Sequence, residues 1–296
     1  MTVRQSMKKI LVIGGTGQVG GAVVSDAPSC GFEPFHFPKR ELDVTNAAQV
    51  EDKIKAITPD VVVNATAYHV VPQCEEHPEE AMQVNAVAVY RLAKLCKQYR
   101  STLVTYSTDY VFDGEKGTLM DEEDSVHPLQ VYGISKAAGE FAALAVYPEG
   151  SFIVRTSALY GGKEGSRSKG GNFVLNILKE AQGQDTLEVS KEQIVSPTFA
   201  GDLSKATLKL LQIGAASGIY HLVNEGYCSL AEFTQEIFRV ADLPTRVSPV
   251  DRGARSGTTK RPKFSALRNT RAKKLGVVLP HWQEGVASYF KLLQAI

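Results

Sequence analysis

A hydroxyl, a phenol and an ammonium group occur in this sequence at a spacing that suits proton transfer to a carbonyl oxygen. Tyr132 and Lys136 are four residues apart in the run YGISK, and Thr108 precedes Tyr132 by 24 residues. Residues four apart share one face of a helix, so Tyr132 and Lys136 can reach the same ligand. A free phenol has a pKa of about 10 and an ammonium favours the phenolate, so we expect Lys136 to lower the pKa of Tyr132. We expect Tyr132 to protonate the carbonyl oxygen and Thr108 to hydrogen-bond to it.

The tyrosine–lysine spacing is not specific by itself, because Tyr90 and Lys94 repeat it inside a predicted helix. Tyr90 is expected to be a packing or interface residue. Tyr132 differs in its context, since a predicted strand ends in Thr108 and an acidic loop separates that strand from the helix that Tyr132 begins. The context, rather than the spacing, predicts the site.

A glycine-rich loop precedes all of these residues. Gly14, Gly17 and Gly20 follow a predicted strand at residues 10–13 and lead into a helix-compatible stretch at residues 20–26. Glycines allow a tight turn and a close approach to a pyrophosphate, whose charge the helix N-terminus stabilises. A plain strand-to-helix turn is the alternative, but the position after the first strand favours a dinucleotide site.

The choice of dinucleotide depends on the end of the second predicted strand. Lys39 and Arg40 could neutralise a 2′-phosphate, or they could be solvated loop charges. Asp43 is expected to help form an adenine pocket rather than to bind the ribose. We therefore expect NADPH, with NADH tolerated.

Strands alternate with helices through the first half of the chain. The predicted strands lie at residues 10–13, 33–37, 61–64, 102–107 and 152–155, with helices between them, for example at 78–99 and 132–147. This order predicts an α/β fold with a doubly wound parallel Rossmann sheet. We expect a dinucleotide-binding domain at residues 1–155, to which segments near 194–224 return, and a smaller substrate-binding lobe formed mainly by residues 156–296.

The second half of the chain has a looser pattern. A strand is predicted at residues 219–223, and a helix at 229–240 that Ser229 caps. Residues 161–171, rich in glycine and charge, predict a mobile loop, and residues 252–263 predict a second, basic loop. Arginines in the basic loop could hold a diphosphate or simply be solvated.

Bulk properties exclude several classes of function. A net charge of +1 over 296 residues argues against a nucleic-acid or membrane partner. No secretory signal and no membrane-spanning run are visible, and the four cysteines lack metal-ligand spacing. We expect a soluble cytoplasmic enzyme with reduced thiols.

Taken with their neighbours, these residues resemble the dTDP-4-dehydrorhamnose reductases, a family of extended short-chain dehydrogenases. The resemblance runs from about residue 9 to residue 282, and its most specific run is STDYVFDG at residues 107–114. The other matching segments are GGTGQVG (14–20), ELDVT (41–45), PDVVVNA (59–65), YGISK (132–136), RTS (155–157), NFV (172–174), Gln193 with Pro197 and Thr198, Arg261 with Pro262, and LPHW (279–282).

The resemblance implies NAD(P)H-dependent reduction of the 4-keto group of a nucleotide-linked 6-deoxyhexose, with dTDP-4-dehydrorhamnose as the expected substrate. It assigns catalysis to Thr108, Tyr132 and Lys136. The residues expected to bind the cofactor are Gly14, Thr16, Gly17, Gln18, Val19, Lys39, Arg40, Asp43, Val44, Asn64, Ala65, Ala67, Tyr132 and Lys136. Those expected to bind the substrate are His69, Asp109, Phe112, Asn172, Gln193 and Arg261. We expect a monomer or a homodimer.

Three departures from the family pattern concern the substrate and a metal. Ala158 stands where the family commonly has a tryptophan that packs on the sugar nucleotide. His69 lies in a run that differs from the family's, so it is a candidate substrate contact or a plain loop histidine. Gly21 and Ala22 replace an acid associated with a magnesium-bridged dimer, and we expect no metal site.

Three other functions compete with reduction of this substrate. A 4,6-dehydratase is disfavoured, because that class has glutamate where this chain has Tyr110. A reductase or epimerase for a different sugar nucleotide stays open. A non-catalytic dinucleotide-binding protein, similar to the regulatory subunit of methionine adenosyltransferase, also stays open, because such proteins can keep ancestral residues.

Overall fold

Apolar runs of the sequence form a six-stranded, wholly parallel sheet in the computed structural model, which describes residues 7–166, 168, 170–251 and 259–295. The strand order is β10-β5-β4-β3-β1-β2. The strands are β1 (Lys8–Ile13), β2 (Phe32–His36), β3 (Val61–Asn64), β4 (Thr102–Thr108), β5 (Ser151–Thr156) and β10 (Gly218–His221). The order reverses between β1 and β3, which is where ligands bind in such sheets.

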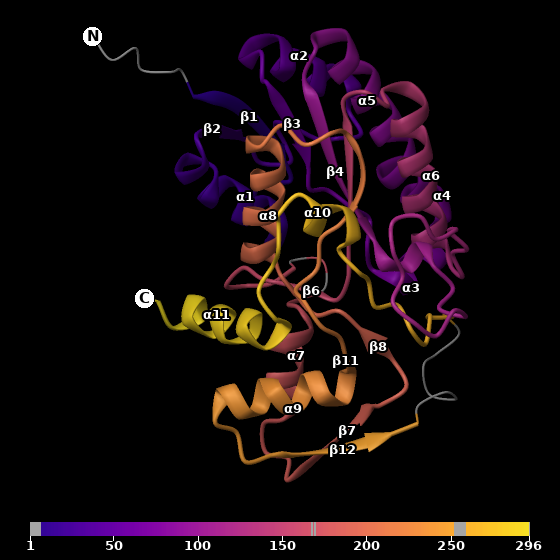
Figure 1. The fold of residues 1–296 in the computed structure, drawn as a ribbon, viewed down its shortest axis with the longest axis vertical. Coiled ribbons are helices and arrows are strands. Elements are labelled where there is room, and N and C mark those ends of the chain that lie inside the picture. The colour runs from indigo at the N-terminus through magenta and orange to yellow at the C-terminus, as the bar shows by residue number, and fades with distance from the viewer. Residues whose placement is uncertain (1–6, 167, 169, 252–258, 296) are drawn as a thin grey trace.

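Helices cover both faces of this sheet (Figure 1). Two of them, α1 (Gln18–Asp26) and α8 (Ala200–Gln212), pack on one face. The other face carries α2 (Ala47–Ile57), α5 (Ala88–Tyr99) and α6 (Val131–Val146). Shorter helical segments are η1 (Pro28–Cys30), α3 (Val71–Glu76), α4 (Pro78–Met82), the π-helix η2 (Gln83–Val87) and η3 (Asp109–Val111).

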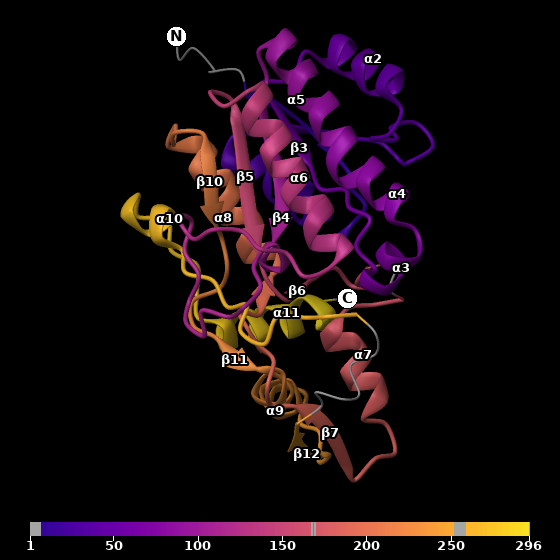
Figure 2. The ribbon, with the colours of Figure 1, turned by 90° about the vertical axis from the view of Figure 1, so that its right-hand side faces the viewer.

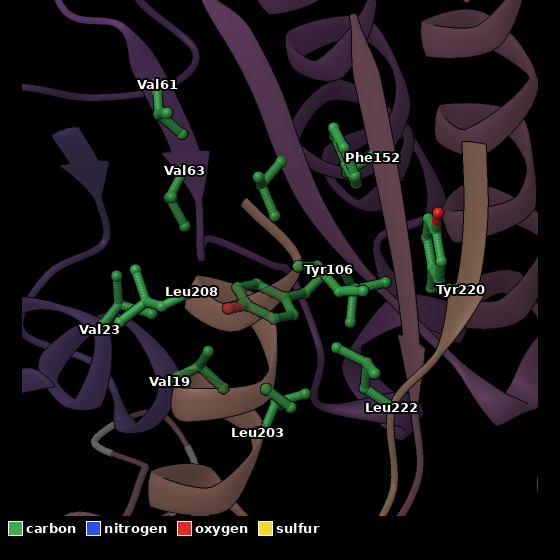
Figure 3. Packing of buried hydrophobic residues seen from close by; sticks show 14 of the residues in the cluster. Val19, Val23, Val61, Val63, Tyr106, Phe152, Leu203, Leu208, Tyr220 and Leu222 are labelled. Atoms are coloured by element: carbon green, nitrogen blue, oxygen red, sulfur yellow. The ribbon is translucent and has the colours of Figure 1, made fainter. Parts of the chain in front are cut away.

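The core between the sheet and the pair α1 and α8 is built around Tyr106 (Figure 3). Its ring lies among aliphatic side chains such as Val63 from the sheet and Leu203 from α8. Its hydroxyl lies 3.2 Å from Oγ1 of Thr207, so the buried oxygen keeps a hydrogen bond. Residues 200–221 thus return to the sheet after the chain has left it.

A smaller lobe lies beyond the carboxyl ends of the strands (Figure 2). Aromatic rings pack together in its core: Tyr160 contacts Phe199, Phe233 and Tyr289 at centroid separations of 5.4–6.0 Å. The lobe contains α7 (Phe173–Glu180), α9 (Leu230–Ala241) and α11 (Trp282–Gln294), and the paired strands β6 (Leu159–Tyr160) with β9 (Thr198–Phe199), β7 (Thr186–Ser190) with β12 (Arg246–Val250), and β8 (Ile194–Val195) with β11 (Cys228–Ser229). A further short helix, α10 (Thr270–Lys274), packs against β10.

The predicted elements are found, with one helix interrupted. The helix expected at residues 78–99 is interrupted by the π-helix η2, where Asn85 turns inward and its amide contacts Tyr68 and Ser135. Ser229 caps α9 as expected, in a full capping box with Glu232. A loop is found at residues 161–171, of which positions 167 and 169 lie outside the described residues. Most of the basic loop, residues 252–258, also lies outside the described residues.

His221 on β10 makes the stability of the fold sensitive to acid. Burial, and next the positive charge of Arg155, lower the pKa of His221 to about 3. The folded chain keeps the imidazole neutral, whereas the unfolded chain takes up a proton below about pH 6.5. Stability is therefore lost as the pH falls from about 6.5 towards 3.

We expect the free energy of unfolding to fall by about 1.4 kcal/mol per pH unit more steeply in the wild type than in His221→Leu between about pH 6 and 4. Urea unfolding at a series of pH values measures both slopes. Parallel slopes in the two proteins would show that His221 does not carry the effect.

Candidate active site

The residues that follow the four central strands line one cavity of about 690 Å³. Gly14 follows β1, Ala65 follows β3, Asp109 follows β4 and Ser157 follows β5, and all four line this cavity. The small lobe closes its other side with residues that include Phe173, Gln193, Leu230 and Phe233. The cavity therefore lies where the topology of a doubly wound sheet predicts a ligand.

The glycine loop leaves the backbone at the start of α1 open. Gly14 has a φ of +82°, which favours glycine, and a Cβ on Gly20 would lie 2.2 Å from the carbonyl oxygen of Gly14. Gly17 is the N-cap residue of α1, and no side chain caps this helix end. Its first backbone N–H groups remain available to an anion. Thr16, Gln18 and Val19 also line the cavity.

At the end of the cavity beside β2, Asp43 is tied down by its own loop. Its carboxylate accepts hydrogen bonds from the backbone N–H of Thr45, at 2.9 Å, and from its hydroxyl, at 2.7 Å. Burial raises the pKa of Asp43, but these bonds and Lys39 outweigh it and the net pKa is lowered. Lys39, Asp43 and Val44 line the cavity, whereas Arg40 does not line it and its Nε lies 3.6 Å from Oε1 of Glu41.

Past β3, the loop that begins with Ala65 is held by Asn64. The Asn64 carboxamide is buried and accepts hydrogen bonds from the backbone and hydroxyl of Thr66. Asn64 therefore shapes the loop without lining the cavity, whereas Ala65 and Ala67 line it.

His69 bridges two walls of the cavity. Its Nδ1 lies 3.2 Å from the carbonyl oxygen of Ala67, and its Nε2 lies 2.9 Å from Oγ of Ser166 and 3.3 Å from Oγ of Ser168. His69 thus connects the loop after β3 to the loop after β6 and lines the space between them.

The three proton-transfer residues all line the cavity. Tyr132 and Lys136 project from α6, and Thr108 ends β4 beside them. The Thr108 hydroxyl donates to Oδ1 of Asp109 at 3.0 Å and accepts from the backbone N–H of Tyr110. A hydroxyl has one hydrogen, so a carbonyl oxygen that enters the site must take over the place of Asp109 as its acceptor.

Burial corrects the expectation for the pKa of Tyr132. The pKa is raised, chiefly by burial and next by the charge of Asp109, while a hydrogen bond with Thr108 lowers it. Lys136 is itself buried, and burial lowers its pKa to about 8 although Glu140 raises it. The expected net lowering of the pKa of Tyr132 is therefore wrong, because loss of solvation dominates the shift. Tyr132 is a neutral phenol at neutral pH, which is the form that can donate a proton.

The buried carboxylate of Asp109 joins three distant segments. Besides Thr108, it accepts hydrogen bonds from Ser157, at 2.8 Å, and from Ser265, at 2.6 Å. Burial raises the pKa of Asp109, and these three hydroxyl groups counteract the shift. Ser157 lies in the run RTS that the sequence analysis singled out, but nothing near Ser265 in the sequence indicates its contact with Asp109.

The expected substrate residues divide into two groups. His69, Asp109, Asn172, Gln193 and Arg261 line the cavity, as does Ala158, which has a φ of +41°. Phe112 is buried outside the cavity, with its ring 5.1 Å from the guanidinium carbon of Arg155 and edge-on to His221. Phe112 therefore packs in the core and does not line the cavity, contrary to the expectation that it binds substrate.

The alternative tyrosine–lysine pair is separate from the cavity. Tyr90 is 43% exposed on α5, and the Lys94 ammonium lies 5.7 Å from the centre of its ring.

Over the described parts of the chain, no group of three or more His, Cys, Asp or Glu side chains could hold a metal ion. No helix in those parts is long and apolar enough to cross a bilayer.

A family model described as the RmlD substrate binding domain matches residues 7–295. The chain belongs to this family. The RmlD-family chain is 33% identical to the spore coat polysaccharide biosynthesis protein SpsK of Bacillus subtilis (strain 168), over 96% of this chain and 98% of that protein. It is 34% identical to the dTDP-4-dehydrorhamnose reductase of Streptomyces griseus, over 96% and 93%.

A solved structure of similar fold is the dTDP-4-dehydrorhamnose reductase of Bacillus anthracis in complex with NADP. The TM-score is 0.88 at 32% identity, and the match covers 97% of this chain and 100% of that one. The family resemblance and the Rossmann-type α/β fold inferred for this RmlD-family chain from its sequence are thereby confirmed.

We expect Gly20→Ala to weaken NADPH binding by about 5- to 150-fold in a fluorescence titration. The added Cβ would meet the Gly14 carbonyl at 2.2 Å, and relief of such a contact costs about 1–3 kcal/mol. Gly21→Ala is the matched control, because its Cβ would lie 3.6 Å from the nearest atom. Equal affinity in the two variants would contradict the role of the glycine loop.

Proposed function

We propose that this protein reduces the 4-keto group of a nucleotide-linked 6-deoxyhexose, converting dTDP-4-dehydrorhamnose to dTDP-rhamnose. The observation that carries the proposal is the shared cavity, in which Thr108, Tyr132 and Lys136 lie with the glycine loop. Relatives that bear the name dTDP-4-dehydrorhamnose reductase support this choice of substrate.

NADPH is the cofactor of this reaction, and NADH is a second cofactor that the site could accept. The uncapped N-terminus of α1, the close packing of Gly20 on Gly14, and Lys39 at the adenosine end suit a dinucleotide with a 2′-phosphate. When bound, NADPH supplies the hydride that adds to the carbonyl carbon.

The chain's own residues manage the proton. Tyr132, kept neutral by burial, donates its phenolic proton to the carbonyl oxygen as negative charge develops there. Thr108 donates a hydrogen bond to the same oxygen after its hydroxyl turns from Asp109. Lys136 binds the nicotinamide ribose, and its positive charge on the same helix face stabilises the phenolate that remains.

The smaller lobe holds the rest of the substrate. We assign it mainly to residues 156–296, with residues 200–221 belonging to the dinucleotide-binding domain that begins the chain. Asn172, Gln193 and Arg261 line the cavity on the side of this lobe. Arg261 suits the substrate diphosphate, because a guanidinium matches phosphate oxygens in geometry and charge. Ala158 leaves room beside the sugar where the family commonly has an aromatic ring.

We expect Tyr132→Phe to lower kcat with NADPH and dTDP-4-dehydrorhamnose by at least about 100-fold, because general acid catalysis contributes about that much or more. NADPH oxidation measured by absorbance reports the rate. Tyr90→Phe is the matched control, since it removes the same hydroxyl from the same spacing outside the cavity. A wild-type protein that binds NADPH without oxidising it would favour a regulatory role.

We expect Lys39→Ala to raise the KM for NADPH by about tenfold and to leave the KM for NADH nearly unchanged, because one charge contact with the 2′-phosphate is lost. Arg40→Ala should have a smaller effect, since Arg40 does not line the cavity. Steady-state kinetics with each cofactor measures both variants. If Arg40→Ala had the larger effect, the assignment of the phosphate contact would be wrong.

A further inference from the structure

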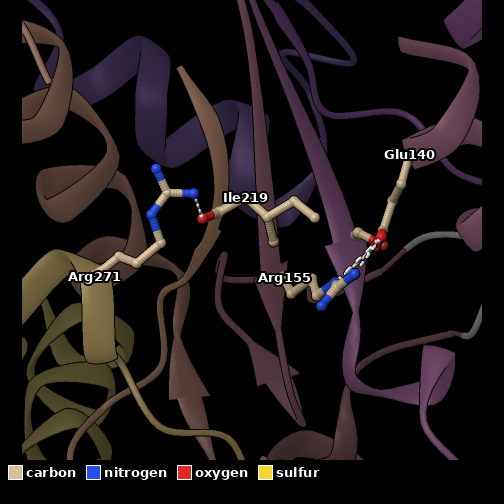
Figure 4. Close-up of polar contacts among 5 residues, drawn as sticks. Glu140, Arg155, Ile219 and Arg271 are labelled. Atoms are coloured by element: carbon tan, nitrogen blue, oxygen red, sulfur yellow. Dashed lines mark hydrogen bonds and ion pairs between the residues drawn. The ribbon is translucent and has the colours of Figure 1, made fainter. Parts of the chain in front are cut away.

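The helix that carries Tyr132 and Lys136 buries a third polar side chain, Glu140. Glu140 follows Lys136 by four residues, and so lies on the same face of α6. Its carboxylate is 2% exposed and takes part in a two-pronged contact with Arg155 (Figure 4). Arg155 Nε lies 3.0 Å from Oε1, and Nη2 lies 2.7 Å from Oε2. The hydroxyl of Ser107 donates a further hydrogen bond to Oε1.

These contacts join the three elements on which the site is built. Glu140 belongs to α6, Ser107 to β4 and Arg155 to β5, and Ser107 and Arg155 are direct partners in the strand pairing. Thr108 is the next residue after Ser107. A single carboxylate therefore sets the distance between the helix that carries the phenol and the strand that ends in the hydroxyl.

Glu140 is also the carboxylate whose negative charge acts on Lys136. Both side chains are buried, and a buried ammonium without a compensating charge loses its proton readily. Burial lowers the pKa of Lys136 to about 8, and the charge of Glu140 opposes this shift. The other titratable or charged groups around this part of the cavity are Tyr132 on the same helix, Asp109 and Tyr110 after β4, Cys74 on α3 and Arg155 on β5.

We propose that Glu140 is a positioning residue of the active site, which aligns α6 with the end of β4 and holds Lys136 in its charged form. The inference rests on the proposed function only in that Lys136 binds the nicotinamide ribose. It predicts that the carboxylate charge, and not only its hydrogen bonds, controls the pH range in which the cofactor binds.

The test is Glu140→Gln, which keeps the size of the side chain and an acceptor oxygen but removes the charge. NADPH affinity is measured by fluorescence titration from pH 6 to 9.5, without any sugar substrate. Wild-type affinity should weaken above about pH 8, as Lys136 loses its proton. We call this fall in affinity the alkaline limb of the binding curve. In E140Q this limb should begin about one pH unit lower, which corresponds to about fivefold weaker binding at pH 8. A limb that does not move overturns the proposal.

Glu236→Gln is the matched control. Glu236 on α9 makes a similar two-pronged contact with Arg239, at 2.8 and 2.6 Å, outside the cavity. E236Q should keep the wild-type limb and the wild-type kcat. A limb shifted in both variants would mean that the effect is a general one of lost ion pairs, and it would also overturn the proposal.

Glu140→Asp separates charge from position, and it decides the outcome if E140Q does not fold. The shorter side chain keeps the charge, so the limb should stay near pH 8, while kcat should fall at least tenfold because the helix is no longer held at its distance from β4. A limb that moves in E140D contradicts the role of charge, and a wild-type kcat contradicts the role of position. If the wild type does not reduce dTDP-4-dehydrorhamnose, the proposed function fails while the binding limbs are still measurable.

Discussion

In the parallel pairing of β4 with β5, Ser107 lies opposite Arg155 and Thr108 lies opposite Thr156. Thr108 lines the cavity at the end of β4, and Arg155 lies one residue earlier along the paired strands. A shift of β5 by one residue would turn Arg155 to the face of the sheet opposite Ser107. The position of α6 follows from the same register, because Glu140 reaches Ser107 and Arg155 together.

Exclusion of water then determines what these groups can do. Burial disfavours every charged form, so it keeps Tyr132 protonated and brings the pKa of Lys136 to about 8. It also strengthens each remaining electrostatic contact, since the local dielectric is low. The phenol is thus poised as an acid by its surroundings, and its ammonium neighbour acts on the phenolate that forms after proton transfer.

Much of this could be predicted from the sequence because it depends on local patterns. The apolar run before Gly14 and the uninterrupted valines at residues 61–63 predict buried parallel strands, and the YGISK run predicts a helix with two reactive side chains on one face. Arg155 also left a signal, since it is the one charge in the apolar strand β5, and Glu140 is one of the two charges, with Lys136, in the otherwise apolar helix α6. Opposite charges in two buried elements indicate a pair.

The rest depends on contacts between distant segments. Ser265 reaches Asp109 across 156 positions, and His69 meets Ser166 across 97. No periodicity carries such information. The sign of the pKa shift of Tyr132 could not be predicted either, because it depends on how completely tertiary packing removes water from the phenol. Phe112 shows the same limit: its run is specific to the family, yet its ring packs behind the site.

The charges buried around the cavity nearly balance one another. Lys136 and Arg155 contribute two positive charges, and Glu140 and Asp109 contribute two negative ones when both are ionised. His221, which packs against Phe112 beside Arg155, stays neutral and adds none. Departure of the Tyr132 proton creates one unbalanced negative charge, which an ammonium on the same helix face can stabilise without reorganising water. A charge balance set before the reaction thus lets a buried phenol act as an acid despite its raised pKa.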